Sequence, residues 1–560
     1  MSRTEPAGTP LGDAFHVYDT TLRDGAQREG ISYSVTDKLA VTRHLDALGV
    51  GYIEGGWPGA MPKDTEFFAR AAAGELELRH AALVAFGATR RAGLAAADDP
   101  QVRALLDSRA PVVTLVAKSD RRHIERALRT DVAENCAMVA DTVAVLRAEG
   151  RRVFLDAEHF FDGYAFDPDT ALRVLEAAVT AGADVAVLCD TNGGMLPLGI
   201  AEVVTEVAAR TGFRLGIHCQ DDTGCAVANS VAAVQAGATH VQCTANGYGE
   251  RAGNADLFAV VGNLVTKLDM PVLRHGAFVE MTRTSQALAE IANIAPDTHQ
   301  AYVGAAAFAH KAGLHASAIK VDPELYNHMD PVDVGNGQRI LVTEMAGRAS
   351  VELKGAELGL DLAGHPGAVS SVVATVKARE AQGWSFEAAD ASLELLMRTA
   401  LGNEALAPFR LESYRVITEH RADGAVVAEA TVKVVVDGQR LIATEEGNGP
   451  VNALDAALRA ALAPSCPWLE KVELSDYKVR ILTPGGVQAA EGPQAAESHG
   501  TGAVTRVLVE STDHTGSWTT VGVHGNVVEA SWLALVDALA FAALQGRPVP
   551  ASVPAPMVVP

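Results

Sequence analysis

Eight short apolar runs, each ending in polar or glycine residues, recur along the first half of the chain. An alanine- and leucine-rich stretch with helical spacing follows each run, and the first of these opens on Ser34-x-x-Asp37, the spacing of a capping box. Such strand–helix alternation predicts a parallel sheet covered by helices. The runs are FHVYDTTLRDG (15–25), VGYIEGGWPG (50–59), HAALVAFGATR (80–90), PVVTLVAKSD (111–120), RRVFLDAEHFFDG (151–163), ADVAVLCDTNGG (183–194), RLGIHCQDDTG (214–224) and THVQCTANGYGERAGN (239–254).

Eight strand–helix units in about 255 residues match the count and size of a (β/α)₈ TIM barrel, an α/β fold. A doubly wound open sheet is the alternative. That fold usually has fewer strands, and no GxGxxG follows the first strand here.

The pattern changes beyond the barrel. Residues 286–404 read as an alanine-rich helical linker, and residues 405–545 alternate β-branched and polar positions. Gly447-Asn448 and Gly525-Asn526 each precede a helix-like stretch after such strands, and the two glycines are 78 residues apart. This repeat predicts an α+β domain built by internal duplication, which lacks catalytic side chains and is typical of a binding or dimerisation module.

The predicted boundaries place the barrel at residues 15–285, between a disordered N-terminus (1–14) and the helical linker. We further expect a mobile Gly/Ala/Pro-rich loop at 484–503 and a disordered tail at 546–560.

Composition excludes several classes of protein. A net charge of −23 with no basic stripe argues against nucleic acid as a partner. No signal-peptide layout is present at the N-terminus, and no apolar run approaches the ~18–20 residues that span a bilayer. The six cysteines show no paired framework. A cytoplasmic protein without a membrane segment is therefore expected.

Polar residues end nearly every predicted strand. In a barrel these ends converge on one mouth, where barrel enzymes carry out their chemistry. Any one of these side chains alone is more often a cap or an ion-pair partner, but their common position favours a site. The residues are Arg23, Asp24, Glu54, Lys118, Asp156, Glu158, Asp190, Thr191, His218, Gln220, Asp222, Asn246, Glu250 and Asn254.

Three of these residues, Asp24, His218 and Asn254, offer a carboxylate, an imidazole and an amide oxygen from three strands. This mixed oxygen and nitrogen set suits an octahedral divalent cation with positions left for a substrate. Separately, Asp24 could be a turn cap and Asn254 a loop hydrogen-bond partner. Taken together, they favour a metal site.

Long stretches carry a family resemblance. They are DTTLRDGAQREG, YIEGGWPG, DAEHFFDGY, LCDTNGG, GCAVANS, NGYGERAGN, HQAYVGAAAFAHKAGLHASA and EGNGPVNALDAAL followed by DYKVRIL. The first resembles the first-strand signature of the DRE-TIM metallolyase superfamily. Together they resemble the 2-isopropylmalate, homocitrate and citramalate synthase family, and most of all its citramalate synthase branch, over roughly residues 15–545.

The resemblance implies an acyltransferase that condenses acetyl-CoA with pyruvate, giving (R)-citramalate and CoA for the biosynthesis of isoleucine, a branched-chain amino acid. By the family pattern Asp24, His218 and Asn254 hold the metal, which polarises the 2-oxoacid. Arg23 stabilises the keto oxygen as it becomes an alkoxide, and Thr191 binds the carboxylate. Glu158 and Glu54 are the two carboxylates that could remove the methyl proton, and the sequence does not choose between them.

The family's usual His-x-His on strand seven is His218-Cys219-Gln220 here. Gln220 could coordinate through its carbonyl oxygen, which would favour Mg²⁺ or Mn²⁺ over Zn²⁺. Alternatively, Gln220 could hold a metal-bound water, or Asp222 could take the ligand position.

The resemblance also places His315 and Tyr326 over the mouth of a partner's barrel, where they assist proton transfer or thioester hydrolysis. It therefore implies a homodimer with shared active sites. An amino-acid effector is implied for the C-terminal domain.

Three other functions remain open from sequence. A 2-isopropylmalate synthase would use the same chemistry on a larger acceptor, 2-oxoisovalerate, and a methylene or two changes discrimination by only ~1–3 kcal/mol. A retro-aldol lyase would not need the C-terminal module. A degenerate barrel acting as an amino-acid-binding protein would explain Gln220 but not the retained Arg23 and Asp24.

Overall fold

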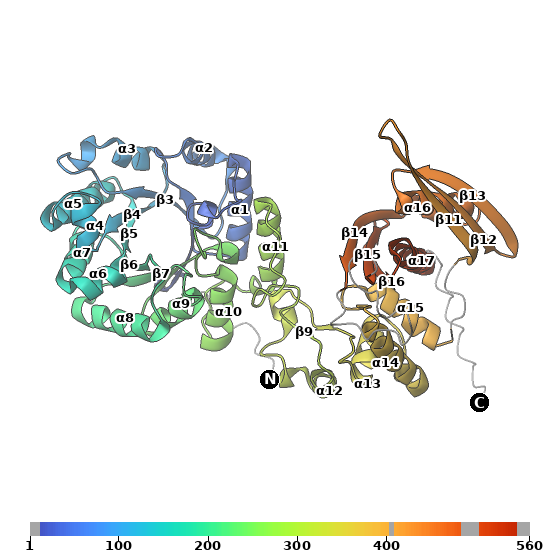
Figure 1. Ribbon diagram of the computed structural model, residues 1–560. Helices are drawn as coiled ribbons and strands as arrows, with labels where there is room; N and C mark the ends of the chain where they lie inside the picture. Colours follow the sequence, from blue (N-terminus) through green and yellow to red (C-terminus); the bar gives the residue numbers. More distant parts are fainter. Residues whose placement is uncertain (1–11, 403–407, 483–502, 546–560) are drawn as a thin grey trace, which may run out of the picture. The chain divides into compact units, whose positions relative to one another are not determined.

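The computed structural model describes residues 12–402, 408–482 and 503–545. Its first half is a closed barrel of eight parallel strands in the order β1 to β8, with helices around the outside (Figure 1). The predicted barrel and its strand order are confirmed. The strands are β1 (His16–Asp19), β2 (Tyr52–Gly56), β3 (Ala82–Ala88), β4 (Val112–Lys118), β5 (Arg152–Glu158), β6 (Val185–Asp190), β7 (Leu215–Cys219) and β8 (His240–Cys243).

Local sequence signals fix the ends of the outer helices. The predicted capping box is present, with Ser34 Oγ accepting from the Asp37 backbone N–H at 3.1 Å and the Asp37 carboxylate accepting from the Ser34 N–H at 2.8 Å. The helices of this part are α1 (Val35–Leu48), α2 (Pro62–Arg70), α3 (Pro100–Asp107), α4 (Arg121–Arg126), α5 (Val132–Ala148), α6 (Phe160–Phe166), α7 (Pro168–Thr180), α8 (Pro197–Thr211), α9 (Ala226–Gln235), α10 (Leu257–Leu268) and α11 (Met281–Ala292).

Two layers of apolar side chains hold the barrel. One fills its interior and includes Tyr18, Tyr52 and Phe154. The other packs the outer strand faces against the helices. Because strand side chains alternate between these layers, every second residue faces the barrel axis, and the polar ones near the strand ends reach the mouth.

The N-terminal segment differs from expectation. Gly12–Ala14 form a short 3-10 turn instead of continuing the predicted disorder to residue 14. The contacts of Asp13 explain the difference, because its carboxylate forms an ion pair with Arg152 at 2.6 Å and a hydrogen bond with His16 Nε2 at 3.0 Å. Residues 1–11 lie outside the described chain.

Residues 281–402 divide between two compact units. One unit comprises residues 1–308 and 327–338, and the other comprises 309–326 and 339–560. The boundary that we expected after residue 285 falls inside α11, which packs on α1 and so belongs with the barrel. The remaining elements are β9 (Ala309–His310), α12 (Gly313–Val321), β10 (Arg339–Ile340), α13 (Arg348–Glu357), α14 (Pro366–Ala381) and α15 (Asp390–Ala400).

The C-terminal part contains the predicted duplication. Two antiparallel three-stranded sheets have the orders β11-β12-β13 and β14-β15-β16, and a helix follows each sheet in the sequence. Their elements are β11 (Arg410–His420), β12 (Val426–Val436), β13 (Gln439–Gly447) and α16 (Pro450–Leu462), then β14 (Glu473–Ile481), β15 (Thr505–Thr512), β16 (Ser517–His524) and α17 (Val527–Gln545). The expected loop lies outside the described residues except for Ala503, and the expected tail lies wholly outside them.

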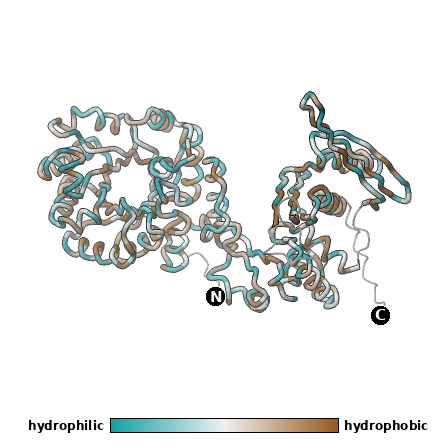
Figure 2. The backbone as a smooth tube through the Cα atoms, in the orientation of Figure 1, coloured by the Kyte–Doolittle hydropathy of each residue, from teal (hydrophilic) through white to brown (hydrophobic). Residues whose placement is uncertain are grey.

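Helix α17 differs from the expectation that no apolar segment is long enough to span a bilayer. It is 19 residues long and apolar enough in length and composition to cross a membrane, although we expected no such segment. Figure 2 shows its largely hydrophobic colouring. Of its most apolar window 61% is buried, and it packs on β15 and β16 and contributes Trp532 and Leu539 to a core. These contacts are those of a core helix.

Short helical turns complete the described elements. They are η2 (Gly25–Gln27), η4 (Ala96–Asp98), η5 (Ala245–Gly247), η6 (Phe278–Glu280), η7 (Pro323–Leu325), η8 (Pro331–Val334), η9 (Pro467–Lys471) and a π-helical turn, η3 (Ala71–Glu75).

Candidate active site

A cavity of about 670 Å³ opens at the carboxyl ends of the barrel strands. Trp57, Phe86, Val116 and Met138 contribute apolar walls. Nine of the polar residues that the sequence places at strand ends line this cavity, so the predicted convergence is observed. They are Arg23, Asp24, Lys118, Asp156, Glu158, Thr191, His218, Gln220 and Glu250.

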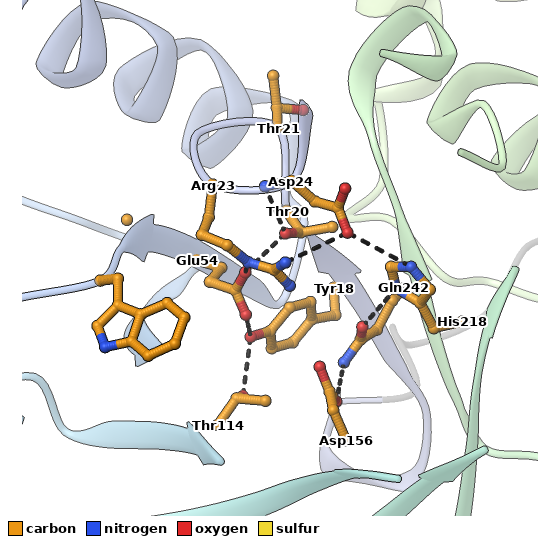
Figure 3. Close-up of polar contacts among 12 residues, drawn as sticks. Tyr18, Thr20, Thr21, Arg23, Asp24, Glu54, Thr114, Asp156, His218 and Gln242 are labelled. Atoms are coloured by element: carbon orange, nitrogen blue, oxygen red, sulfur yellow. Dashed lines mark hydrogen bonds and ion pairs between the residues drawn. The ribbon is translucent and has the colours of Figure 1, made fainter. Parts of the chain in front are cut away.

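Arg23 is fixed by a buried carboxylate (Figure 3). Its Nε donates to Glu54 Oε1 at 2.5 Å, and its guanidinium lies 3.8 Å above the centre of the Phe86 ring. Burial lowers the pKa of Arg23, but the charges of Glu54 and Asp24 outweigh this effect and raise it above its ordinary value. Arg23 is therefore a permanent cation at the cavity wall.

Glu54 has no free oxygen for chemistry. Its side chain is fully buried, Oε2 accepts from the Tyr18 hydroxyl, and Oε1 accepts from Thr20 as well as Arg23 (Figure 3). The hypothesis that Glu54 could act as the base does not fit this geometry, because each oxygen is already engaged and Glu54 does not line the cavity.

Four predicted metal ligands lie together. Asp24 Oδ2 lies 3.5 Å from His218 Nε2, Asn254 Nδ2 donates to Asp24 Oδ1 at 3.2 Å, and Gln220 Nε2 lies 3.4 Å from His218 Nε2. Burial raises the pKa of Asp24, but the charge of Arg23 and the hydrogen bond from Asn254 more than reverse this effect and lower it below the ordinary value. The carboxylate is thus ionised, as a metal ligand must be.

A glutamine sets the tautomer of His218. Gln242 Nε2 donates to Asp156 Oδ1 at 2.8 Å, so its Oε1 is the atom that faces His218 Nδ1, also at 2.8 Å (Figure 3). His218 Nδ1 must then carry the proton, which leaves the Nε2 lone pair directed toward Asp24. Burial, and next the charge of Glu54, raise the pKa of Asp156 to about 8.

The chemistry of this group fits a divalent cation. Gln220 Oε1 and Asn254 Oδ1 are both buried and have no hydrogen-bond partner. Unpartnered buried oxygens are costly, and a cation bound between them and Asp24 and His218 would satisfy both. Across the described ranges no three His, Cys, Asp or Glu side chains gather in a metal-binding group, because two of the four donors here are amides.

The loop that carries Asn254 depends on glycine. Gly253 has φ +100°, and a Cβ there would lie 2.1 Å from the Gly247 carbonyl oxygen. Only glycine permits both this φ and this approach. The turn returns Asn254 to β7, where it forms an isolated bridge with Gln220.

Thr191 and Glu158 lie on neighbouring strand ends. The backbone N–H of His159 donates to Thr191 Oγ at 2.8 Å, so the hydroxyl hydrogen of Thr191 is available to an acceptor. Glu158 is 26% exposed and forms an ion pair with Lys118. The Glu158 carboxylate and the Thr191 hydroxyl both line the cavity, where a substrate could contact them.

Other predicted residues serve the framework. Asp190 accepts from the N–H groups of Gly194 and Met195, and Asp222 pairs with Arg251 at 2.8 Å. Asn246 bonds to Ser285 and Gln300. The hypothesis that Asp222 replaces the missing histidine does not fit, because its carboxylate is held by Arg251 and it is absent from the cavity lining.

His315 and Tyr326 belong to the second compact unit. Their rings stack with centroids 4.0 Å apart, and Tyr326 is 44% exposed. The structure brings these two residues to each other, and their catalytic role stays a prediction.

Sequence reasoning missed several contributors. Tyr18, Thr20 and Phe86 support Arg23 and Glu54, and Gln242 orients His218. Tyr18 and Gln242 are paired positions on β1 and β8, both in strands with side chains turned into the barrel. Counting alternate residues back from each strand end could have found them.

Three family models match successive parts of the chain, and relatives match nearly all of its length. The family model HMGL-like matches residues 14–294, a homocitrate synthase post-HMGL domain-like model matches 302–383, and a LeuA allosteric (dimerisation) domain matches 387–543. The (R)-citramalate synthase of Streptomyces coelicolor is 62% identical and the alignment covers 97% of this chain and 99% of that protein. The (R)-citramalate synthase of Synechocystis is 48% identical over 94% and 95%. A probable 2-isopropylmalate synthase of Methanopyrus kandleri is 32% identical over 94% and 98%.

Barrel, mouth and matched domains together define an HMGL-like enzyme, a class whose members use a divalent metal. Within that class the chain belongs to the (R)-citramalate synthase family. The helical part and the duplicated C-terminal domain are those of the same family of synthases, including the allosteric dimerisation module.

Proposed function

We propose that this chain condenses acetyl-CoA with pyruvate, releasing (R)-citramalate and CoA, at the mouth of its barrel. The observation that carries the proposal is the group of two unpartnered amide oxygens beside Asp24 and His218, with the Arg23 cation next to it. High identity along the whole chain to (R)-citramalate synthases supports pyruvate over 2-oxoisovalerate as the acceptor.

Asp24, His218, Gln220 and Asn254 would hold the cation. Bound there, it would act as a Lewis acid on the keto group of the 2-oxoacid. Three of the four donors are oxygens, which favours Mg²⁺ or Mn²⁺ and leaves Zn²⁺ as the weaker alternative.

Arg23 and Thr191 would orient the acceptor. The Arg23 guanidinium, fixed by Glu54 and Asp24, is placed to stabilise negative charge as the keto oxygen becomes an alkoxide. The free hydroxyl hydrogen of Thr191 donates to the acceptor carboxylate. Glu54 acts only as the anchor of Arg23.

Glu158 would be the base that takes a proton from the acetyl methyl group, since of the two candidate bases, Glu54 and Glu158, it is the one that lines the cavity. The resulting enolate carbon attacks the keto carbon of pyruvate and forms the new C–C bond. Water then cleaves the thioester and CoA leaves as the thiol.

His315 and Tyr326 would assist the later proton transfers from a partner subunit of a homodimer. Leu314 and Val321 on α12 are 82% and 83% exposed, and Leu325 is 60% exposed. Apolar exposure of this size supports burial against a second copy. The C-terminal domain would bind an amino-acid effector, and the enzyme would work in the cytoplasm.

CoA release from acetyl-CoA tests the proposal. The protein is stripped with a chelator, resupplied with Mg²⁺, Mn²⁺ or Zn²⁺, and given pyruvate or 2-oxoisovalerate. We expect turnover with pyruvate that chelation abolishes and Mg²⁺ or Mn²⁺ restores. Preference for 2-oxoisovalerate, or no turnover with either acceptor, would contradict it.

A further inference from the structure

Lys118 is a strand-end residue of the cavity that the reaction described above does not use. It ends β4 and lies directly beside Glu158 in the register of β4 and β5. The two side chains form an ion pair, are 23% and 26% exposed, and both line the cavity. A partly exposed ion pair contributes only about 0–1 kcal/mol to stability, so stability alone gives little reason for a lysine here.

Hydrogen bonds made by three neighbouring residues fix the strand ends that carry this pair. Ser119 donates to the Glu158 carbonyl through both its N–H, at 3.1 Å, and its hydroxyl, at 2.7 Å. Asn135 Nδ2 donates to the Lys118 carbonyl at 3.0 Å. His159, in the left-handed region with φ 59°, ties the other side of Glu158 to Thr191. The ends of β4, β5 and β6 are thereby fixed, which pre-organises the charges at the cavity wall.

We propose that Lys118 is a catalytic residue whose ammonium stabilises the enolate oxygen of acetyl-CoA while Glu158 removes the methyl proton. This inference rests on the proposed condensation. An ammonium has three donors, so the bond to Glu158 leaves others for the thioester oxygen.

The charges balance throughout this step. The methyl C–H bond breaks and its proton goes to Glu158. The electron pair of that bond forms the new C=C bond, and the π electron pair of the thioester carbonyl moves onto its oxygen. Negative charge therefore passes from the carboxylate to an oxygen beside the same ammonium. Arg23 remains available for the second oxyanion, which develops on pyruvate.

Lys118→Met tests the role through the deuterium isotope effect. The rate with pyruvate is compared between acetyl-CoA and acetyl-CoA deuterated in its methyl group. Loss of one oxyanion donor should lower kcat by about 10²-fold and make proton removal rate-limiting. We expect a larger isotope effect on kcat and a KM for pyruvate within about threefold of wild type. Lys118→Arg, which keeps the charge, should recover part of kcat.

Lys478→Met is the matched control, because Lys478 also pairs with a carboxylate, Asp476, but on β14 of the other unit. It should change neither kcat nor the isotope effect. Circular dichroism and Mg²⁺ binding establish that each variant is folded, and Lys118→Gln replaces Lys118→Met should the latter not fold.

An unchanged kcat and isotope effect in folded Lys118→Met would overturn the inference, as would a rise in KM for pyruvate alone. Wild-type protein that releases no CoA would instead overturn the proposed condensation itself.

Discussion

Glu54 and Glu158 are both glutamates of barrel strands, but their different surroundings suit them to different roles. Glu54 is fully buried and neutralises Arg23, whereas Glu158 faces the cavity. Removing one partner of a buried ion pair leaves an uncompensated charge, and removing a part-exposed one does not.

Paired substitutions should separate these roles. Glu54→Gln should lower the free energy of unfolding of the barrel by about 3–5 kcal/mol. Glu158→Gln should change it by less than about 1 kcal/mol, yet lower kcat by at least about 10²-fold. Chemical denaturation and CoA release measure the two effects. A stable, inactive Glu54→Gln beside an active Glu158→Gln would reverse the assignment of the base.

As a proposed ligand, Gln220 should influence which cation the site prefers. Gln220→His adds a second imidazole beside His218, so we expect affinity for Zn²⁺ to rise by about tenfold relative to Mg²⁺. Gln220→Ala removes the donor without replacing it and should weaken both. Titration calorimetry on chelator-stripped protein gives both affinities. An unchanged Zn²⁺ to Mg²⁺ ratio in Gln220→His would show that residue 220 does not contact the cation.

The sequence predicts residues of this site that end strands, because strand ends are visible as polar residues after apolar runs. Arg23, Asp24 and His218 were found in this way. Supporting residues inside the barrel, such as Gln242 and Tyr18, lie among apolar neighbours. Strand alternation can identify them as inward-facing positions, but their roles depend on which strands are neighbours in the closed barrel, and no local pattern encodes that.

At the scale of elements, the repeated strand–helix alternation was enough to predict the barrel and the order of its strands. It was not enough to predict where the barrel domain ends. Helix α11 joins the barrel because it packs on α1, a contact between segments more than two hundred residues apart. Helix α17 was not recognised as one long apolar helix, because Glu529 and Asp537 interrupt its apolar pattern.

Asp537 makes the packing of α17 sensitive to pH. It accepts from the Ser392 hydroxyl of α15 at 2.7 Å, and burial raises its pKa to about 6 from its ordinary value of 3.8. The folded state therefore binds a proton more tightly than the unfolded state, so stability falls as the pH rises from about 4 to about 6.

Asp537→Asn should remove this loss. We expect its free energy of unfolding at pH 7.5 to exceed that of wild type by about 1–2 kcal/mol, with the difference gone at pH 4. Denaturation curves at the two pH values measure it, with Asp513→Asn as a control, because Asp513 lies in a turn and its pKa is lowered by hydrogen bonds from Thr515. A gain that persists at pH 4 would assign the effect to packing instead of charge.

At the scale of the whole molecule, the residues of the proposed active site are divided between the two compact units. The barrel carries the strand-end residues, and the other unit carries His315, Tyr326 and the allosteric dimerisation domain. The homodimer proposed above would bury the apolar side chains of α12 that are exposed in the single chain. It also makes complementation between inactive subunits the sharpest test of the assembly.

Glu158→Gln and His315→Ala should each be inactive as homodimers. In a heterodimer of the two, a site that takes Glu158 from one subunit and His315 from the other is intact once per dimer. We therefore expect heterodimers, isolated through two different affinity tags, to have about half the wild-type kcat per dimer. Each variant carrying both tags and paired with itself is the control. Heterodimers as inactive as these controls would mean that every site is built within one subunit, since each heterodimer would then contain two defective sites.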